Sequence, residues 1–258
     1  MDAGSALGAL GVIAIVLLGA GAVVALVLFM VHQAKLQRQR MEALEQLANG
    51  LSFGGPGAGW FGDFDSHAVA QHFEDFQSGH SRGATWIRHG KVSVHGIRGE
   101  MVFGDYHYKV TSGSGKNQTT TTYQFSFLFW VPIMDLPESL ALRRENFLDR
   151  IGEWVGVDDI DFESSEFSRK FHIKCSDKRA AVDLFDPRMM EWMLEETPPG
   201  MSVRGGAFFF RGATLWSAAE YVGLVKWIGA FVMRLPRHFV DARCPREDVE
   251  VWESNSRK

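Results

Sequence analysis

The stretch 105–131, DYHYKVTSGSGKNQTTTTYQFSFLFWV, decides the fold. Toward both of its ends, aromatic and aliphatic residues recur at every second position, which is the period of a half-buried β-strand. The residues predicted to share one face are Tyr106, Tyr108, Val110, Tyr123, Phe125, Phe127, Phe129 and Val131. Residues 111–122 between the two runs are polar, so the stretch predicts an antiparallel hairpin with a long polar loop.

Predicted helices and further strands alternate around this hairpin. Helical spacing of apolar residues predicts helices over 65–79, 135–156, 176–185, 186–196 and 217–235. The expected N-caps of the last three helices are Ser176, Asp186 and Ser217. One more strand pair is predicted over 159–164 and 169–175, and another over 201–212 with its turn at Gly205 and Gly206. The predicted order is strand, strand, helix, three times over, which implies an α+β fold with an antiparallel sheet and helices on one face.

One helix near the N-terminus is predicted to cross a membrane. Residues 6–31 contain no charged or strongly polar side chain. At about 1.5 Å per residue, a helix of that length exceeds the roughly 30 Å hydrocarbon thickness of a bilayer. A cleaved signal peptide is the alternative, but residues 1–5 lack the basic residues that precede such a peptide.

Basic residues predict the orientation of this helix. Lys35, Arg38 and Arg40 follow the apolar run, and no basic residue precedes it. Because basic flanks stay in the cytoplasm, the N-terminus is expected outside and everything after residue 32 inside. Membrane lipid is therefore the expected partner of residues 6–31.

The chain is expected to divide into four parts. They are a transmembrane and juxtamembrane helix (1–53), a glycine-rich linker (54–66), a cytoplasmic α+β domain (67–240) and a charged, disordered tail (241–258). The formal net charge is -4, and residues 1–53 contribute nothing to it, so nucleic acid is not an expected partner. The two cysteines, Cys175 and Cys244, set no disulfide framework.

Residues 79–83, Gly79-His80-Ser81-Arg82-Gly83, match the G-x-S-x-G motif of a serine hydrolase. In such an enzyme the serine sits on a strained turn between a core strand and a helix. The segment before Gly79 has helical rather than strand periodicity, so the context of the motif is wrong. We expect a glycine turn that ends a helix, and keep Ser81 as the candidate nucleophile of an alternative function.

Three further patterns carry only weak signals for ligands. Asp159, Asp161 and Glu163 share one face of a predicted strand and are the candidate metal ligands, although a solvent-facing charged strand is the usual meaning. His172 and Cys175 are three positions apart on a strand and point to opposite faces, so they cannot share a metal ion. Residues 113–117, GSGKN, lack the other residues of a phosphate-binding loop. No cofactor or resident metal is expected.

Contact surfaces with membrane and partners are predicted as well. The candidates for the membrane interface are Lys35, Arg38, Arg40, Trp60, Phe61 and Trp227. Trp227 belongs to the helix over 217–235, whose apolar arc is wide enough to be buried in the domain or to lie on a membrane or a partner. Gly4 and Gly8 form one G-x-x-x-G, a spacing found in paired membrane helices, and are the candidate positions for a homodimer, although glycines are common in membrane helices generally.

Residues from about 73 to 196 resemble a family of bacterial membrane-anchored proteins without an assigned activity. The matching stretches are HFEDFQSGHSRGATWIRHG, GDYHYKVTSGSGKNQTTTTYQ, LPESL, DIDFESSEFSRKFHIKCSDKRAAVDLFDPRMMEWMLE and the hairpin GGAFFFRG. The resemblance implies a single-pass anchor in the bacterial inner membrane, a small α+β domain, and a position for Ser81 in a loop before a strand. It carries over no catalytic residues.

These patterns together favour a membrane-anchored cytoplasmic module that binds or scaffolds a protein partner. Two alternatives remain open. One is a membrane-tethered serine hydrolase that uses Ser81, and the other is a domain that recognises a lipid surface through the last predicted helix and the aromatic residues at 60–64.

Overall fold

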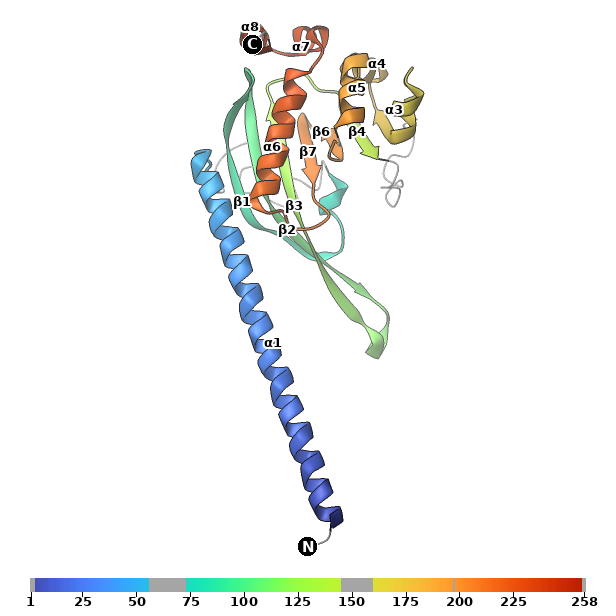
Figure 1. Cartoon of the computed structure of the whole chain (residues 1–258). Coiled ribbons are helices and arrows are strands. Elements are labelled where there is room, and N and C mark those ends of the chain that lie inside the picture. The colour runs from blue at the N-terminus through green and yellow to red at the C-terminus, as the bar shows by residue number, and fades with distance from the viewer. Residues whose placement is uncertain (1–2, 56–72, 145–159, 197, 257–258) are drawn as a thin grey trace. The chain divides into compact units, whose positions relative to one another are not determined.

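The computed structural model describes residues 3–55, 73–144, 160–196 and 198–256 (Figure 1). The chain forms two compact units, Met1–Leu47 and Ala48–Lys258. The predicted linker over 54–66 lies almost entirely outside the described residues.

The first unit is helical. Helix α1 runs from Ala3 to Gly50, over 48 residues without interruption. Within it, Leu18–Gly50 is long and apolar enough to cross a membrane by length and composition, and no residue of its apolar window is buried. Leu18 is 75% exposed and Phe29 is 59% exposed, so these side chains have not been covered by the fold of the chain itself.

The second unit is built on a seven-stranded sheet in which every pairing is antiparallel (Figure 1). The strands are β1 (His80–Val94), β2 (Ile97–Ser112), β3 (Thr119–Pro132), β4 (Ser139–Arg144), β5 (Phe171–Cys175), β6 (Met201–Arg204) and β7 (Ala207–Arg211). Their order across the sheet is β1-β2-β3-β7-β6-β4-β5. The α+β class and the antiparallel sheet are therefore as predicted.

Short helices complete the unit. They are η1 (Glu74–Phe76), η2 (Gly115–Asn117), α3 (Ser165–Lys170), α4 (Lys178–Leu184), α5 (Pro187–Glu195), α6 (Ala218–Met233), α7 (Arg237–Arg243) and α8 (Arg246–Ser256). Two of the predicted N-caps are confirmed: the Asp186 carboxylate accepts from Met189 N–H, and Ser217 forms a capping box with Glu220. Helix α4 is capped by Asp177 instead of Ser176.

One face of the sheet is covered by an aromatic core around Phe76. The residues that share this core include Phe73, Tyr106, Tyr108, Phe125, Phe127, Phe129 and Phe209. Phe76 is fully buried, and its backbone carbonyl accepts a hydrogen bond from the Tyr106 hydroxyl at 2.9 Å. Most of the face predicted from the period-two pattern of β2 and β3 is thus buried, whereas Val110 and Tyr123 at its outer end are exposed.

The other face is covered by α6, with α5 beside it. The ring of the buried Tyr221 of α6 lies 5.1 Å from the ring of Phe103 of β2, and its hydroxyl donates to the Gly104 carbonyl at 2.8 Å. Trp192 of α5 stacks on Trp227 of α6 at 5.5 Å between ring centroids. This layer fixes the start of α6 against the middle of β2 and β3.

The repeated strand, strand, helix order is not confirmed, because a strand replaces part of a predicted helix. Residues 139–144, expected inside the helix over 135–156, form β4, which pairs with β5 on one side and β6 on the other. Leu140 and Leu142 are fully buried there, so tertiary pairing overrides the local preference for helix. The rest of that predicted helix lies outside the described residues.

Two neighbouring predictions are also corrected. Residues 160–164, expected as a strand, have no strand structure, and Ser164 instead caps α3 by accepting from Phe167 N–H at 3.2 Å. The helix predicted over 65–79 appears in its described part only as η1. Strand β1, which pairs with β2 along its length, has no counterpart among the predicted elements.

The tail predicted over 241–258 is not disordered through its described residues. It contains the end of α7 and all of α8, whose Trp252 is 5% exposed and donates its indole N–H to the Val232 carbonyl at 2.9 Å. Asp248 of α8 is also buried and accepts from the Arg98 side chain at 2.6 Å. An amphipathic helix with one large aromatic anchor therefore replaces the expected charged tail.

Candidate functional site

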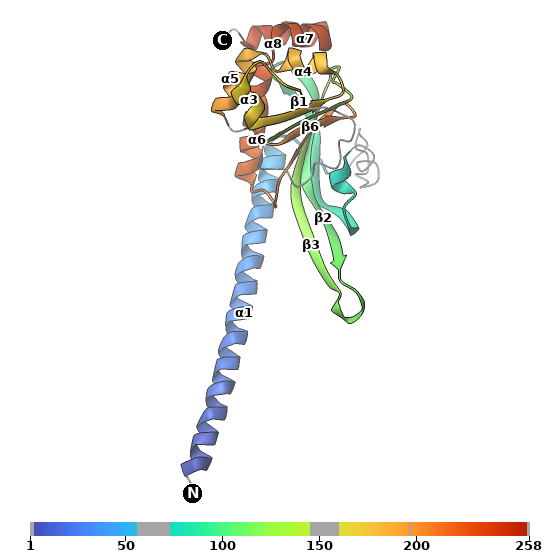
Figure 2. The same cartoon turned by 90° about the vertical axis from the view of Figure 1, so that its right-hand side faces the viewer.

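The β2–β3 hairpin projects beyond the rest of the sheet as an arm, which we define as residues 107–124 (Figures 1 and 2). Every residue from Val110 to Gln124 is exposed. The two strands stay in register out to the pair Ser112 and Thr119, so the arm is a continuous ribbon. From Val110 to Gln124 it presents backbone and side chains that the core does not use.

The two faces of the arm differ in chemistry. On the face that continues the aromatic core, Tyr108 stacks on Tyr123 at 5.2 Å between ring centroids. Tyr123 is 46% exposed and Val110 is 37% exposed, so apolar surface reaches beyond the core. The opposite face, by the alternation of the strands, carries His107, Lys109 and Thr111.

A row of hydrogen bonds crosses the arm near its outer end, at the pair Thr111 and Thr120, and contains Ser81. The His80 imidazole bonds to the Ser81 hydroxyl at 3.2 Å through Nδ1 and to the Thr111 hydroxyl at 2.9 Å through Nε2. Thr111 in turn bonds to the Thr120 hydroxyl at 2.9 Å. All four side chains are exposed, so this hydroxyl row lies open to water.

The arrangement around Ser81 lacks the parts of a nucleophile elbow. The chain order here is η1, turn, β1, whereas an elbow needs a core strand before the serine and a helix after it. Ser81 has φ 49° and lies in a bulge of β1, between the register pairs of His80 and Gly83. Both described partners of His80 are hydroxyls, so no described carboxylate orients it as a base.

The first glycine of the motif, Gly79, has a packing role. Gly79 has φ 63°, and a Cβ there would overlap the Lys109 carbonyl of β2. The left-handed backbone expected of a glycine turn is present at Gly79, but the helix that the turn was expected to end appears in its described part only as η1. Contrary to the implied loop, Ser81 lies inside strand β1.

Buried polar groups lie where the arm joins the α6 layer. Asp105 and Ser126 are opposite each other on β2 and β3, and the Ser126 hydroxyl donates to the Asp105 carboxylate at 2.6 Å. The backbone N–H of Trp216 donates to the same hydroxyl at 2.7 Å, which ties the approach to α6 to the hairpin. Within the described chain, Nδ1 of His107 is buried without a hydrogen-bond partner.

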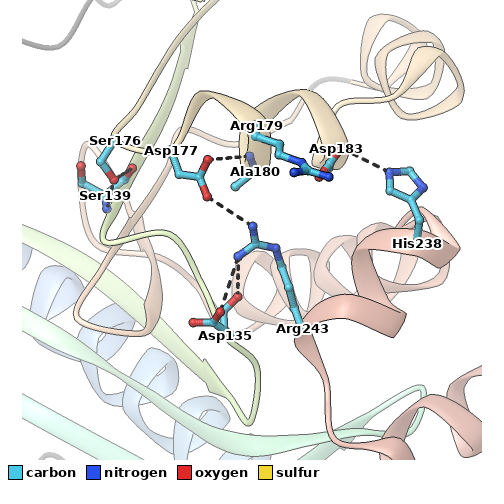
Figure 3. A network of polar contacts seen from close by, with 9 residues as sticks. All are labelled: Asp135, Ser139, Ser176, Asp177, Arg179, Ala180, Asp183, His238 and Arg243. Atoms are coloured by element: carbon cyan, nitrogen blue, oxygen red, sulfur yellow. Dashed lines mark hydrogen bonds and ion pairs between the residues drawn. The ribbon is translucent and has the colours of Figure 1, made fainter.

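A second polar network joins α4 to α7, and Figure 3 shows how its side chains converge on Arg243. The Arg243 guanidinium lies 3.4 Å from the Asp177 carboxylate and donates to the Asp135 carbonyl at 3.1 Å. The hydrogen bond from Ala180 N–H lowers the pKa of Asp177, and Arg243 lowers it further. His238 adds a longer contact to Asp183 at 3.8 Å. These contacts cap α4 and dock α7, so their role is structural.

The candidate metal ligands are not brought together. Asp161 and Glu163 are exposed and lie outside any strand, while Asp159 falls outside the described residues. Among the residues that the structure describes, no group of three or more His, Cys, Asp or Glu side chains could hold a metal ion. His172 is half-buried and Cys175 buried on β5, consistent with opposite faces.

Neither cysteine has the properties of a reactive thiol. Burial raises the pKa of Cys175, and burial raises the pKa of Cys244 to about 12. At neutral pH both side chains therefore hold their proton and are poor nucleophiles.

The candidate membrane-interface residues fall into two groups. Lys35 and Arg38 are exposed and Arg40 is half-exposed on α1, while Trp60 and Phe61 lie outside the described residues. Trp227 is half-buried and stacks on Phe231 at 5.4 Å as well as on Trp192, so its ring packs within the α5–α6 layer.

One feature of the arm is not predicted from the sequence. Strand β3 begins at Thr119, and on the side away from β2 its first residues pair with no described strand. The sequence pattern assigns residues 119–122 to a loop, whereas they begin a strand. Four consecutive threonines followed by a tyrosine have high β propensity, and that signal could have extended the predicted strand.

Comparisons with known proteins place few limits on function. No family model matches the chain, and no curated protein matches it. A solved structure, the mycobacterial trehalose monomycolate transport factor A, aligns with a TM-score of 0.47 at 10% sequence identity, covering 74% of this chain and 93% of that one. A likeness at this level decides neither fold nor function.

Proposed function

We propose that this chain is a membrane-anchored module that binds or scaffolds a protein partner through the arm. The observation that carries the proposal is the exposed apolar surface of α1, in which no residue of the apolar window is buried. Such a surface is costly in water at about 25 cal/mol per Å² and is stable in lipid. In this proposal α1 lies in the bilayer and tethers the compact α+β unit to it.

The proposed orientation places the α+β unit in the cytoplasm, at the inner membrane. Lys35 and Arg38 are exposed directly after the apolar segment, where basic residues favour the cytoplasmic side. Cys175 and Cys244 are both free thiols, which is compatible with a reducing compartment.

The arm is the proposed binding element because it is ordered by strand pairing and is exposed from Val110 to Gln124. A preformed ribbon loses little conformational entropy when a partner binds. Its exposed Tyr123 supplies a rigid aromatic contact of the kind enriched at interfaces.

The anchor is tested by extracting membranes with alkaline carbonate. The full-length protein is expected to stay in the membrane pellet, whereas a Leu18→Arg/Val23→Arg variant is expected to move to the soluble fraction. Both side chains are exposed on α1, and each new charge would have to enter hydrocarbon. A Gln37→Arg/Gln39→Arg variant adds the same charge after the apolar segment and is the matched control.

Protease added from the periplasmic side of spheroplasts tests the orientation. The α+β unit is expected to survive intact and to be digested only after lysis. Release of wild-type protein by carbonate, or digestion in intact spheroplasts, contradicts the proposal.

A serine hydrolase is the second candidate function, and the 3.2 Å contact between His80 and Ser81 is the observation that favours it. A fluorophosphonate probe is nevertheless expected to leave the protein unlabelled, because the serine lacks a carboxylate-oriented base and an elbow. Ser81→Ala serves as the control for background signal. Labelling of the wild type that disappears in Ser81→Ala establishes the hydrolase instead.

A further inference from the structure

We infer that the open edge of β3, residues 119–125, pairs antiparallel with the same edge of a second copy of this chain. One side of β3 is paired with β2 throughout, from Ser112–Thr119 to Gly99–Pro132. On its other side, β3 pairs with β7 only from Phe127 to Trp130. The described structure thus leaves one edge of the arm without a strand.

The backbone groups at this edge can be assigned from Ser126. Its N–H donates to the Thr214 carbonyl at 3.2 Å, and its carbonyl accepts from Gly212 N–H at 2.8 Å, so residue 126 faces away from β2. Every second residue of a strand points its N–H and carbonyl to the same side. Thr120, Thr122 and Gln124 therefore direct their backbone groups outward, to an edge where all three residues are exposed.

The edge lacks the features by which exposed strands usually avoid pairing. Such strands are commonly blunted by a charged side chain or by proline. Residues 117–126, NQTTTTYQFS, contain neither. The edge is instead rich in threonine, which has high β propensity.

A second copy is the occupant that the composition favours. An uncharged edge meets an identical edge without like-charge contacts, whereas a charged peptide would gain nothing from it. Antiparallel strands are also self-complementary about a two-fold axis. A pairing centred on Thr122 sets this residue opposite its own copy and places Thr120 opposite Gln124, so outward groups meet outward groups.

The pairing also extends the apolar face of the arm. Tyr123, which is 46% exposed, would lie diagonally across from its counterpart in the second copy, near Thr121. Cross-strand contacts of aromatic and β-branched residues stabilise a sheet. This interface uses the α+β unit and is separate from the G-x-x-x-G of Gly4 and Gly8 on α1.

The inference rests on the proposed function in one respect, because two copies held in one membrane meet at a raised effective concentration. The two ideas fail separately. If the protein stays in the carbonate pellet but does not pair through β3, the inference is wrong and the membrane anchor is still supported. If carbonate releases the protein but it still pairs through β3, the anchor is wrong and the interface is still supported.

The test is disulfide crosslinking of full-length Thr122→Cys protein in its membranes under mild oxidation. Opposed residues in a hydrogen-bonded antiparallel pair have Cα atoms about 5.5 Å apart, within the range that a disulfide spans. A crosslinked dimer is therefore expected on a non-reducing gel. Val110→Cys is the matched control, because Val110 is also exposed on the arm but lies on β2, one strand away from the edge.

The expected result is about tenfold more dimer for Thr122→Cys than for Val110→Cys, with Cys175 and Cys244 present in both variants. Equal crosslinking of the two variants overturns the inference.

A second measurement does not depend on cysteine chemistry. Energy transfer between donor- and acceptor-labelled copies in one membrane is expected for the wild type and is expected to be lost in Thr120→Lys/Thr122→Lys. The two new charges at position 122 would face each other across the pair, and each charge at position 120 would lie diagonally from the charge at 122 of the other copy. Both positions are exposed, so the fold is expected to survive, as checked by protease resistance. Energy transfer that persists unchanged in this variant also overturns the inference.

Discussion

Phe76→Ala is expected to lower the free energy of unfolding of the α+β unit by about 3–5 kcal/mol, the cost of truncating a fully buried phenylalanine. Phe76 is fully buried at the centre of the aromatic core. Its ring centroid lies 4.7 Å from that of Tyr106 and 5.5 Å from those of Phe125 and Phe209. The cavity left by alanine would remove contacts to three strands at once.

Urea unfolding followed by circular dichroism or tryptophan fluorescence measures this loss. Val182→Ala is the control, because Val182 is 50% exposed on α4 and a surface change there is expected to stay within about 0.5 kcal/mol. A Phe76→Ala protein as stable as Val182→Ala would show that η1 does not hold the sheet face.

Gly79→Ala is expected to destabilise the unit by about 2–4 kcal/mol, combining backbone strain with overpacking. Gly79 has φ 63°, in the left-handed region that favours glycine. The added methyl group would also overlap the Lys109 carbonyl and approach Tyr108 Cδ2 at 3.0 Å. Either β1 shifts along β2 at this point or the arm opens at its base.

Gly83→Ala provides the comparison within the same five-residue motif. A Cβ at Gly83 would meet His107 Cε1 at 3.4 Å and nothing closer, so a loss below about 1 kcal/mol is expected. Ser81→Ala is expected to be similarly mild, since its hydroxyl is exposed. Thermal unfolding of the three variants gives the ranking, and a mild Gly79→Ala would remove the packing explanation of the motif.

Local patterns predicted the parts of the fold that local forces determine. The faces of β2 and β3 followed from alternation at period two, and the capping box of Ser217 and Glu220 followed from two residues three apart. The turn of the β6–β7 hairpin followed from Gly205 and Gly206, both of which have positive φ. In each case the stabilising partners are close in sequence.

Elements that depend on distant partners could not be predicted in this way. Strand β1 contains His89, Gly90 and Lys91 in its middle, which break any alternation, and it is a strand because β2 pairs with it. Strand β4 lies between β5 and β6, whose sequences come later in the chain. Pairings with strands so distant in sequence cannot be predicted from the local propensity of the residues.

The candidate site shows the same limit. The motif around Ser81 could be doubted from sequence because its flanks were wrong for an elbow. The hydroxyl row could not be foreseen, because it joins His80 to Thr111 across two strands. The open edge of β3 depended on how few residues β7 pairs with, which no local pattern reports.

The strand order also has a consequence for biosynthesis. Strands β1, β2 and β3 are consecutive in the chain, so the three-stranded meander can form as soon as Pro132 has left the ribosome. Its neighbour β7 ends at Arg211 and is synthesised later, after a delay of about 4–16 seconds at ~5–20 residues per second. During that interval Phe127–Trp130 would present an apolar unpaired edge to the solvent, and a nascent-chain chaperone that binds extended hydrophobic segments would be expected to bind there.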